Sequence, residues 1–163
     1  MNVANPHDTM TPEESAQAIR RHITDGVALA RKSGLPEQMI NIISQHHGDG
    51  MVTYFYRMAQ MQGPVEDESV FQYPSIKPQT KEAGVLMLAD VVEATIRANN
   101  SIRMDLSTIH EQIQKLVMER YNSGQLDECP LTRRDMTHII DAFVRVLQGA
   151  NHERIAYPED PKK

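Results

Sequence analysis

Apolar residues recur every three or four positions over most of the chain, which is the spacing of amphipathic α-helices. The clearest case opens at Thr11-Pro12-Glu13-Glu14, where a capping hydroxyl, a proline and two acids favour a helix start. Its apolar stripe runs from Ala18 to Ala30, and Gly34 is expected to end it. Five further helices are predicted, at about residues 36–47, 51–61, 81–98, 107–122 and 132–148. No stretch alternates apolar and polar residues as a strand would, so the sequence predicts an all-α fold.

The segment between the third and fourth predicted helices, residues 62–80, contains Pro64, Pro74 and Pro78. We expect an ordered loop there, and long loops inside compact domains often serve function. The short second helix is expected to bury a run of four apolar residues, Met39, Ile40, Ile42 and Ile43.

Length and composition are those of one ordinary globular domain, with 163 residues, 40% of them hydrophobic and 24% charged. We place this domain at residues 11–158, between a lead-in segment at 1–10 and a tail at 159–163. The net charge of −5 argues against a protein that wraps nucleic acid polymers, although a local pocket could still hold a small anion. The single cysteine, Cys129, excludes an internal disulfide, and no segment resembles a signal peptide or a membrane span. We therefore expect a cytoplasmic location.

Asp90 stands out because it interrupts the most apolar predicted helix, between Val85 and Val92. A carboxylate buried all round costs several kcal/mol unless it is paired, protonated or bound to a metal. The sequence leaves two readings open, a metal ligand and a salt bridge to a buried arginine or lysine.

Three histidines precede Asp90 at the ends or edges of predicted helices. His22 lies beside the apolar stripe of the first helix, and His46 and His47 close the second. A lone histidine is often a half-buried, hydrogen-bonded residue, and histidines at a helix end stabilise its negative pole, so structural roles remain open. Taken together, three imidazoles and one carboxylate suit Zn, Mn or Fe better than Mg or Ca.

Residues that could contact a substrate lie in the proline-rich segment and the third predicted helix. Lys77 and Lys81 precede a helix start and could hold a phosphate, or they could simply belong to a solvated basic loop. Tyr54 could stack on a base or pack in the core. Cys129 has no identifiable base beside it, so we do not expect a nucleophile there.

Several of these strings occur together in one known family. The matching segments are Asn5-Pro6-His7-Asp8, His22 with Asp25-Gly26, His46-His47-Gly48, Tyr54-Phe55-Tyr56, Tyr73-Pro74, Lys77 to Glu82, Met87-Leu88-Ala89-Asp90, Gly124 to Cys129, Phe143 to Gly149, and Arg154-Ile155 with Tyr157-Pro158. In this order they resemble the HD domain of the seven-transmembrane-receptor type. These are bacterial cyclic di-AMP phosphodiesterases, which are membrane-attached and act in signalling on the cytoplasmic side.

The resemblance implies a two-metal hydrolase that opens a cyclic dinucleotide to the linear form, with iron or manganese as the metals. It assigns His22, His46 and His47 to one metal and Asp90 to the other. The family also requires an earlier histidine and an adjacent His-Asp pair, which would precede Asn5; the string His7-Asp8 corresponds to a later loop.

The resemblance therefore implies the C-terminal part of an HD domain without its HD pair, with weak or no hydrolysis by this chain alone. The alternative is a non-catalytic helical module derived from an HD domain. Such a module would bind a metal or a partner, and exposed apolar surface would favour self-association or a complementing chain.

Overall fold

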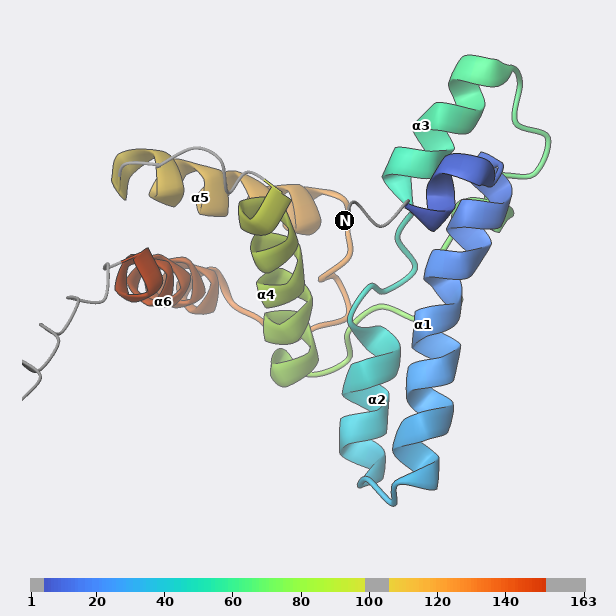
Figure 1. Cartoon of the computed structure of the whole chain (residues 1–163). Helices are drawn as coiled ribbons and strands as arrows, with labels where there is room; N and C mark the ends of the chain where they lie inside the picture. Colours follow the sequence, from blue (N-terminus) through green and yellow to red (C-terminus); the bar gives the residue numbers. More distant parts are fainter. Residues whose placement is uncertain (1–4, 99–105, 152–163) are drawn as a thin grey trace, which may run out of the picture.

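The computed structural model describes residues 5–98 and 106–151, and these fold into helices joined by turns and by a longer loop between α3 and α4 (Figure 1). The α-helices are α1 (Pro12–Lys32), α2 (Glu37–Gln45), α3 (Thr53–Gln62), α4 (Lys81–Ala98), α5 (Leu106–Asn122) and α6 (Arg133–Asn151), with two 3-10 helices, η1 (Pro6–Thr9) and η2 (Glu68–Phe71). Within these described ranges the only extended pairing is a bridge between Met51 and Gln72. The predicted all-α class is confirmed, and none of the described helices combines the length and hydropathy needed to cross a bilayer.

The start of α1 follows from its local sequence. The Thr11 hydroxyl accepts the N–H of Glu14 at 3.2 Å, and the Glu14 carboxylate accepts the N–H of Thr11 at 2.9 Å. This reciprocal capping satisfies two backbone donors that have no partner inside the helix. After Lys32 the chain turns through Gly34, whose φ of 71° is left-handed, and returns as α2 against α1. The two helices form a hairpin (Figure 1).

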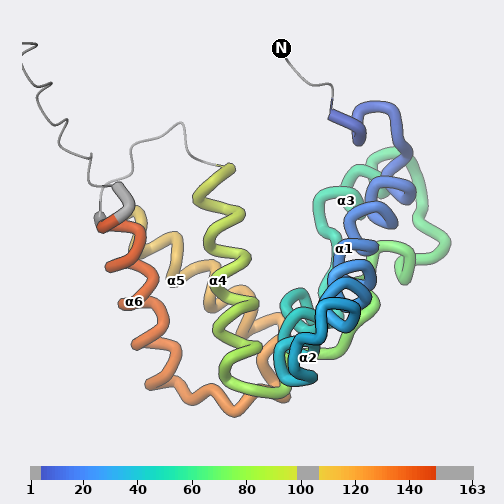
Figure 2. Tube along the Cα trace, turned by 60° about the horizontal axis from the view of Figure 1, so that its bottom comes forward, coloured from blue at the N-terminus to red at the C-terminus, as the bar shows by residue number. Residues whose placement is uncertain are grey.

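Two hydrophobic clusters divide the described residues into two halves. The first joins α1, α3 and η2 through Ala16, Val52, Ala59 and Phe71. The second joins α4, α5 and α6 and contains Met87, Leu88, Val92, Ile109, Ile113, Val117, Leu126, Cys129, Met136, Ile139, Ile140 and Val144. Figures 1 and 2 show α1 to α3 on one side and α4 to α6 on the other, with α2 in contact with α4. The end of α2 therefore lies at the junction of the two halves.

The C-terminal half is held together by polar contacts as well as by its core. Asp135, in the first turn of α6, accepts the N–H and hydroxyl of Thr132 at 2.8 Å each and the Lys81 ammonium at 2.7 Å. Cys129 is buried, and its thiol donates to the Thr80 carbonyl at 3.1 Å. Burial raises the pKa of this thiol, so the group packs rather than reacts.

The structure corrects several sequence-based expectations about burial. Met39 was expected in the core and is 50% exposed, because α2 packs with Ile40 inward and Met39 on its outer side. Tyr54 is 68% exposed, which argues against the alternative that it packs in the core, and its ring contacts only that of Phe55 at 5.0 Å among the ring pairs of the described residues.

The third helix begins at Thr53 rather than Met51, since Met51 pairs with Gln72. In the expected lead-in, residues 6–9 form η1, and the His7 ring lies 5.2 Å from that of Phe55. The last predicted family segments, residues 154–158, and the tail lie outside the described residues.

Candidate metal centre

The hairpin of α1 and α2 brings three imidazoles into one group. His22 lies in the middle of α1, His46 is the C-cap of α2, and His47 follows in the turn. One ligand nitrogen from each ring lies within 4.8 Å of the others. Neighbouring residues diverge by about 100° within a helix. His46 and His47 can both face His22 because α2 has already ended at Gln45.

Backbone carbonyls select the tautomer of two of the rings. His22 Nδ1 lies 2.5 Å from the Ile19 carbonyl oxygen, and His46 Nδ1 lies 2.6 Å from that of Ile43. Because a carbonyl can only accept, each Nδ1 carries the proton and each Nε2 presents a lone pair in the neutral ring. The two Nε2 atoms lie 3.2 Å apart. Two ligands about 2.1 Å from one transition-metal ion are separated by roughly 3.0–3.4 Å, so this spacing suits a shared cation.

His47 is held neutral and oriented by its surroundings. Burial lowers its pKa to about 3, with further contributions from the neighbouring His46 and His22 and from Arg120. The neutral ring stacks on Tyr73 with centroids 4.3 Å apart and an interplanar angle of 13°. Burial raises the pKa of Tyr73, and the Asp90 carboxylate raises it further. A neutral, oriented imidazole is the form that binds a metal.

Asp90 lies beside this histidine group, as the sequence suggested, but its environment differs. Its Oδ2 is 3.7 Å from His47 Nδ1, which is too long for a hydrogen bond, and a neutral His47 makes no ion pair. The Asp90 side chain is 42% exposed, so the expectation of a carboxylate buried all round is wrong. Helix α4 contacts α2, Asp90 lies near His47 just beyond the end of α2, and His22 is also exposed. The site therefore opens to solvent.

Three imidazoles and one carboxylate form a mixed nitrogen and oxygen donor set, which suits Zn, Mn or Fe. The arrangement of the residues therefore fits a bound transition metal. A family comparison supports the same reading, since a model of the HD domain matches residues 3–95. The chain belongs to the HD-domain family.

Relatives of this HD domain include two curated proteins named cyclic-di-AMP phosphodiesterase PgpH. The protein of Bacillus subtilis is 36% identical over 163 residues, and that of Listeria monocytogenes is 36% identical over 156 residues. The alignments cover 100% and 96% of this chain but 23% and 21% of the relatives. The chain thus spans less than a quarter of their length.

Two solved structures of an HD domain share the fold of this chain. The crystal structure of the Listeria monocytogenes PgpH HD domain in complex with cyclic-di-AMP matches with a TM-score of 0.85 and 36% identity. The match covers 94% of this chain and 71% of that one. A second structure of the same domain gives a TM-score of 0.83. The six α-helices of the described residues therefore follow the HD fold.

The two predicted phosphate-binding lysines of the HD domain differ in their contacts. Lys81 pairs with Asp135 at 2.7 Å, which ties α4 to α6. Lys77 is mostly covered and lies 3.9 Å from the exposed carboxylate of Asp127, so its ammonium is more weakly engaged. Neither ion pair includes a histidine of the candidate centre. Of the two ammonium groups, that of Lys77 is the less tightly paired.

Sequence reasoning missed two residues of the site. Tyr73 appeared only as part of a family string, and nothing in its local sequence shows that it stacks on His47. Arg120, at the end of α5, lowers the pKa of both His47 and Tyr73, which places a positive charge near them. Arg120 lies on an amphipathic helix far along the chain, so no sequence pattern links it to the histidines.

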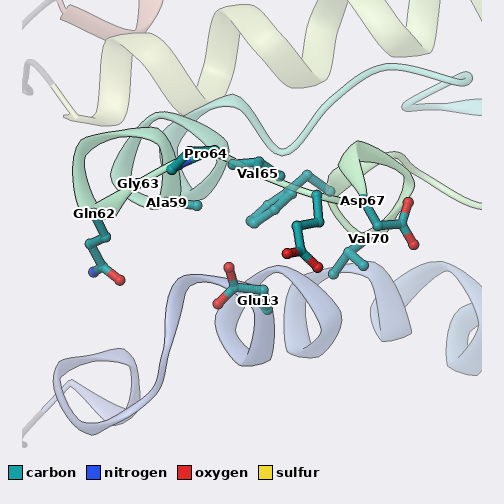
Figure 3. A pocket seen from close by; sticks show the side chains of 10 residues that line it. Glu13, Ala59, Gln62, Gly63, Pro64, Val65, Asp67 and Val70 are labelled. Carbon is teal, nitrogen blue, oxygen red and sulfur yellow. The ribbon is translucent and has the colours of Figure 1, made fainter.

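A separate hollow of ≈ 360 Å³ lies between the start of α1 and the end of α3 (Figure 3). Its lining includes Glu13, Gln62, Glu66, Asp67 and Phe71 and none of the histidines. The hollow is distinct from the candidate metal centre.

Proposed function

We propose that this HD domain contributes the metal centre of a phosphodiesterase that hydrolyses cyclic di-AMP to the linear dinucleotide. The observation that carries the proposal is the pair of Nε2 lone pairs of His22 and His46, 3.2 Å apart, with neutral His47 and Asp90 beside them. The substrate follows from the relatives named for that activity and from the similar HD domain in complex with cyclic-di-AMP.

In this proposal His22, His46 and His47 hold one divalent ion, and Asp90 serves a neighbouring one. Iron and manganese are the proposed metals, by the family resemblance and because the donor set mixes imidazole with carboxylate. When bound, such ions polarise a phosphoryl oxygen and lower the pKa of water. The chain's own residues do the positioning: the carbonyls of Ile19 and Ile43 orient two rings.

The remaining site residues suit an anionic substrate. Tyr73 fixes the plane of His47 by stacking. Arg120 and Lys77 supply positive charge for the phosphates, and Lys81 is the weaker candidate because Asp135 holds it. Tyr54, exposed on α3, remains a proposed surface for a base. A two-metal clamp needs a bridging carboxylate besides these residues, so we expect the 163-residue polypeptide alone to turn over cyclic di-AMP weakly or not at all.

One observation favours a second candidate, a module completed by another chain or by a second copy. Tyr54, Met58 and Met61 recur on one side of α3 and are 68%, 38% and 83% exposed. Leu29 on α1 is 65% exposed. Such apolar surface favours association. Light scattering across a concentration series, with and without Mn²⁺, distinguishes a monomer from an assembly.

Metal titration tests the proposed centre directly. Calorimetry with Mn²⁺ should show one tight site in the wild type, and His46→Ala should abolish it. His110→Ala removes an exposed histidine of α5 outside the group and should leave the binding unchanged. Absence of binding in the wild type would refute the metal centre. Robust hydrolysis of cyclic di-AMP by the isolated polypeptide would refute the expected weakness of the chain alone.

A further inference from the structure

The loop that directly follows His46 and His47, here called the histidine loop, is hydrogen-bonded to two other parts of the chain. On one side, the Tyr73 N–H donates to the Gly50 carbonyl at 2.8 Å, and the Gln72 amide donates to the Asp49 carbonyl at 3.1 Å. On the other side, Gln125 Nε2 donates to Asp49 Oδ1 at 2.7 Å. Gln125 lies just after α5, so this bond links the C-terminal half of the domain to the histidine loop.

The Gln125 amide is buried and has a defined orientation. The residue is 7% exposed. An ionised carboxylate only accepts hydrogen bonds, so the amide nitrogen must face Asp49 and the amide oxygen must point the other way. That oxygen has no hydrogen-bond partner among the described residues, although it is buried. Such an unpaired buried polar atom lowers stability, so its position in the fold calls for an explanation.

The amide oxygen lies directly against the residue after His47. A Cβ atom added to Gly48 would lie 2.2 Å from Gln125 Oε1 and 3.0 Å from the terminal methyl of Met87. Gly48 also has a φ of 59°, in the left-handed region that glycine favours. The Gly48 backbone and the Gln125 side-chain amide are thus in direct contact, which leaves the loop little room to shift.

We propose that Gln125 is a positioning residue for the metal centre. By holding Asp49 and abutting Gly48, it keeps His46 and His47 in place relative to His22. The Gln125 backbone N–H donates to the Arg120 carbonyl at 3.2 Å, which joins this contact to the end of α5. The inference rests on the proposed function only for its effect on metal affinity, because its effect on the loop needs no metal.

A pair of substitutions that exchanges hydrogen-bond donor and acceptor tests the contact. Gln125→Glu places a second carboxylate against Asp49 and should weaken Mn²⁺ binding, followed by the paramagnetic resonance of free Mn²⁺, by about tenfold. Adding Asp49→Asn to Gln125→Glu restores a hydrogen bond with donor and acceptor exchanged and should recover most of the affinity. Gln112→Glu is the matched control, since Gln112 also has a buried, unpartnered amide oxygen but lies earlier on α5.

Hydrogen exchange of the metal-free protein gives an independent readout. The amides of Gly48, Gly50 and Tyr73 should exchange at least about tenfold faster in Gln125→Glu than in Gln112→Glu, because these amides lie in or bond to the loop. If Gln125→Glu does not fold, the uncharged Gln125→Met takes its place. Unchanged exchange and unchanged Mn²⁺ affinity overturn the inference. A wild type that binds no Mn²⁺ refutes the proposed metal centre, and the exchange rates then decide the inference alone.

Discussion

The Nε2 atom of His22 lies 3.2 Å from the Nε2 atom of His46, and each ring uses its Nδ1–H on a carbonyl of its own chain segment. Both rings therefore present lone pairs to the same small volume. This arrangement is unfavourable without a cation or a proton between the two nitrogens, because like partial charges repel. A metal ion removes the repulsion, so binding and stability should be coupled.

Metal addition should raise the resistance of the protein to unfolding. At a Mn²⁺ concentration of about 100 times the dissociation constant, the free energy of unfolding should rise by roughly 2.7 kcal/mol. Urea denaturation followed by circular dichroism measures the change. His22→Ala should lose most of the gain, whereas His110→Ala should keep it, and equal gains in all three proteins would contradict the assigned ligands.

We expect Tyr73 to support Mn²⁺ binding through its aromatic ring rather than through its hydroxyl. Tyr73→Phe preserves a ring to stack on His47, so Mn²⁺ affinity should change by less than about threefold. Tyr73→Leu removes the stacking that fixes the imidazole plane and should weaken binding by about tenfold. Calorimetry on both variants checks the difference. If the two substitutions weaken binding equally, the phenol hydroxyl is the part that matters.

We expect a side chain at Gly48 to destabilise the protein for two reasons, the left-handed backbone and the close contact with Gln125. Gly34 shares only the first of these, so it separates the two effects. Both glycines have left-handed φ values, 59° and 71°, which cost an L-residue about 1–2 kcal/mol. A Cβ at Gly34 meets nothing within 4 Å, whereas one at Gly48 meets Gln125 at 2.2 Å. Gly34→Ala should therefore cost roughly 1 kcal/mol and Gly48→Ala clearly more, measured by urea denaturation. Equal losses would show that the close approach at Gly48 relaxes freely.

The ion pair between Lys81 and Asp135 should make the free energy of unfolding depend on pH in the acid range. The hydrogen bond from Lys81, followed by those from Thr132, holds the pKa of Asp135 well below its ordinary value of 3.8. Because the pKa of Asp135 is lower in the folded than in the unfolded protein, the ionised carboxylate stabilises the fold at pH values above the unfolded pKa. This contribution is lost as the pH falls below 3.8 and through the folded pKa. Wild type should therefore exceed Asp135→Asn in stability at pH 7, and the gap should narrow below about pH 4.

The control for this acid dependence is Glu93→Gln, which removes a highly exposed pair with Arg97 at 3.5 Å. Exposed pairs of this kind contribute little, so its stability should track the wild type across the same pH range. Denaturation midpoints at several pH values measure both variants. A gap for Asp135→Asn that stays constant below pH 4 would contradict the assignment.

Much of the helical framework could be predicted because its determinants are local. Capping at Thr11, the turn at Gly34 and the bounds of residues 81–98 depend on neighbours a few positions away. Burial was harder to predict. Met39 lies in a run of apolar residues and is nevertheless exposed, because only packing against α1 and α4 decides which side of α2 is covered.

By itself the sequence determined the all-α class, most helix bounds and the residue types that could bind a metal, since periodicity and side-chain chemistry are properties of the chain. The tertiary structure alone decided which of those residues meet. It placed His22 next to His46 and stacked Tyr73 on His47. It also left the Asp90 side chain partly exposed and placed Gln125 in contact with the histidine loop. These contacts join residues far apart in sequence, and their geometry depends on how helices pack against one another, which no short sequence window encodes.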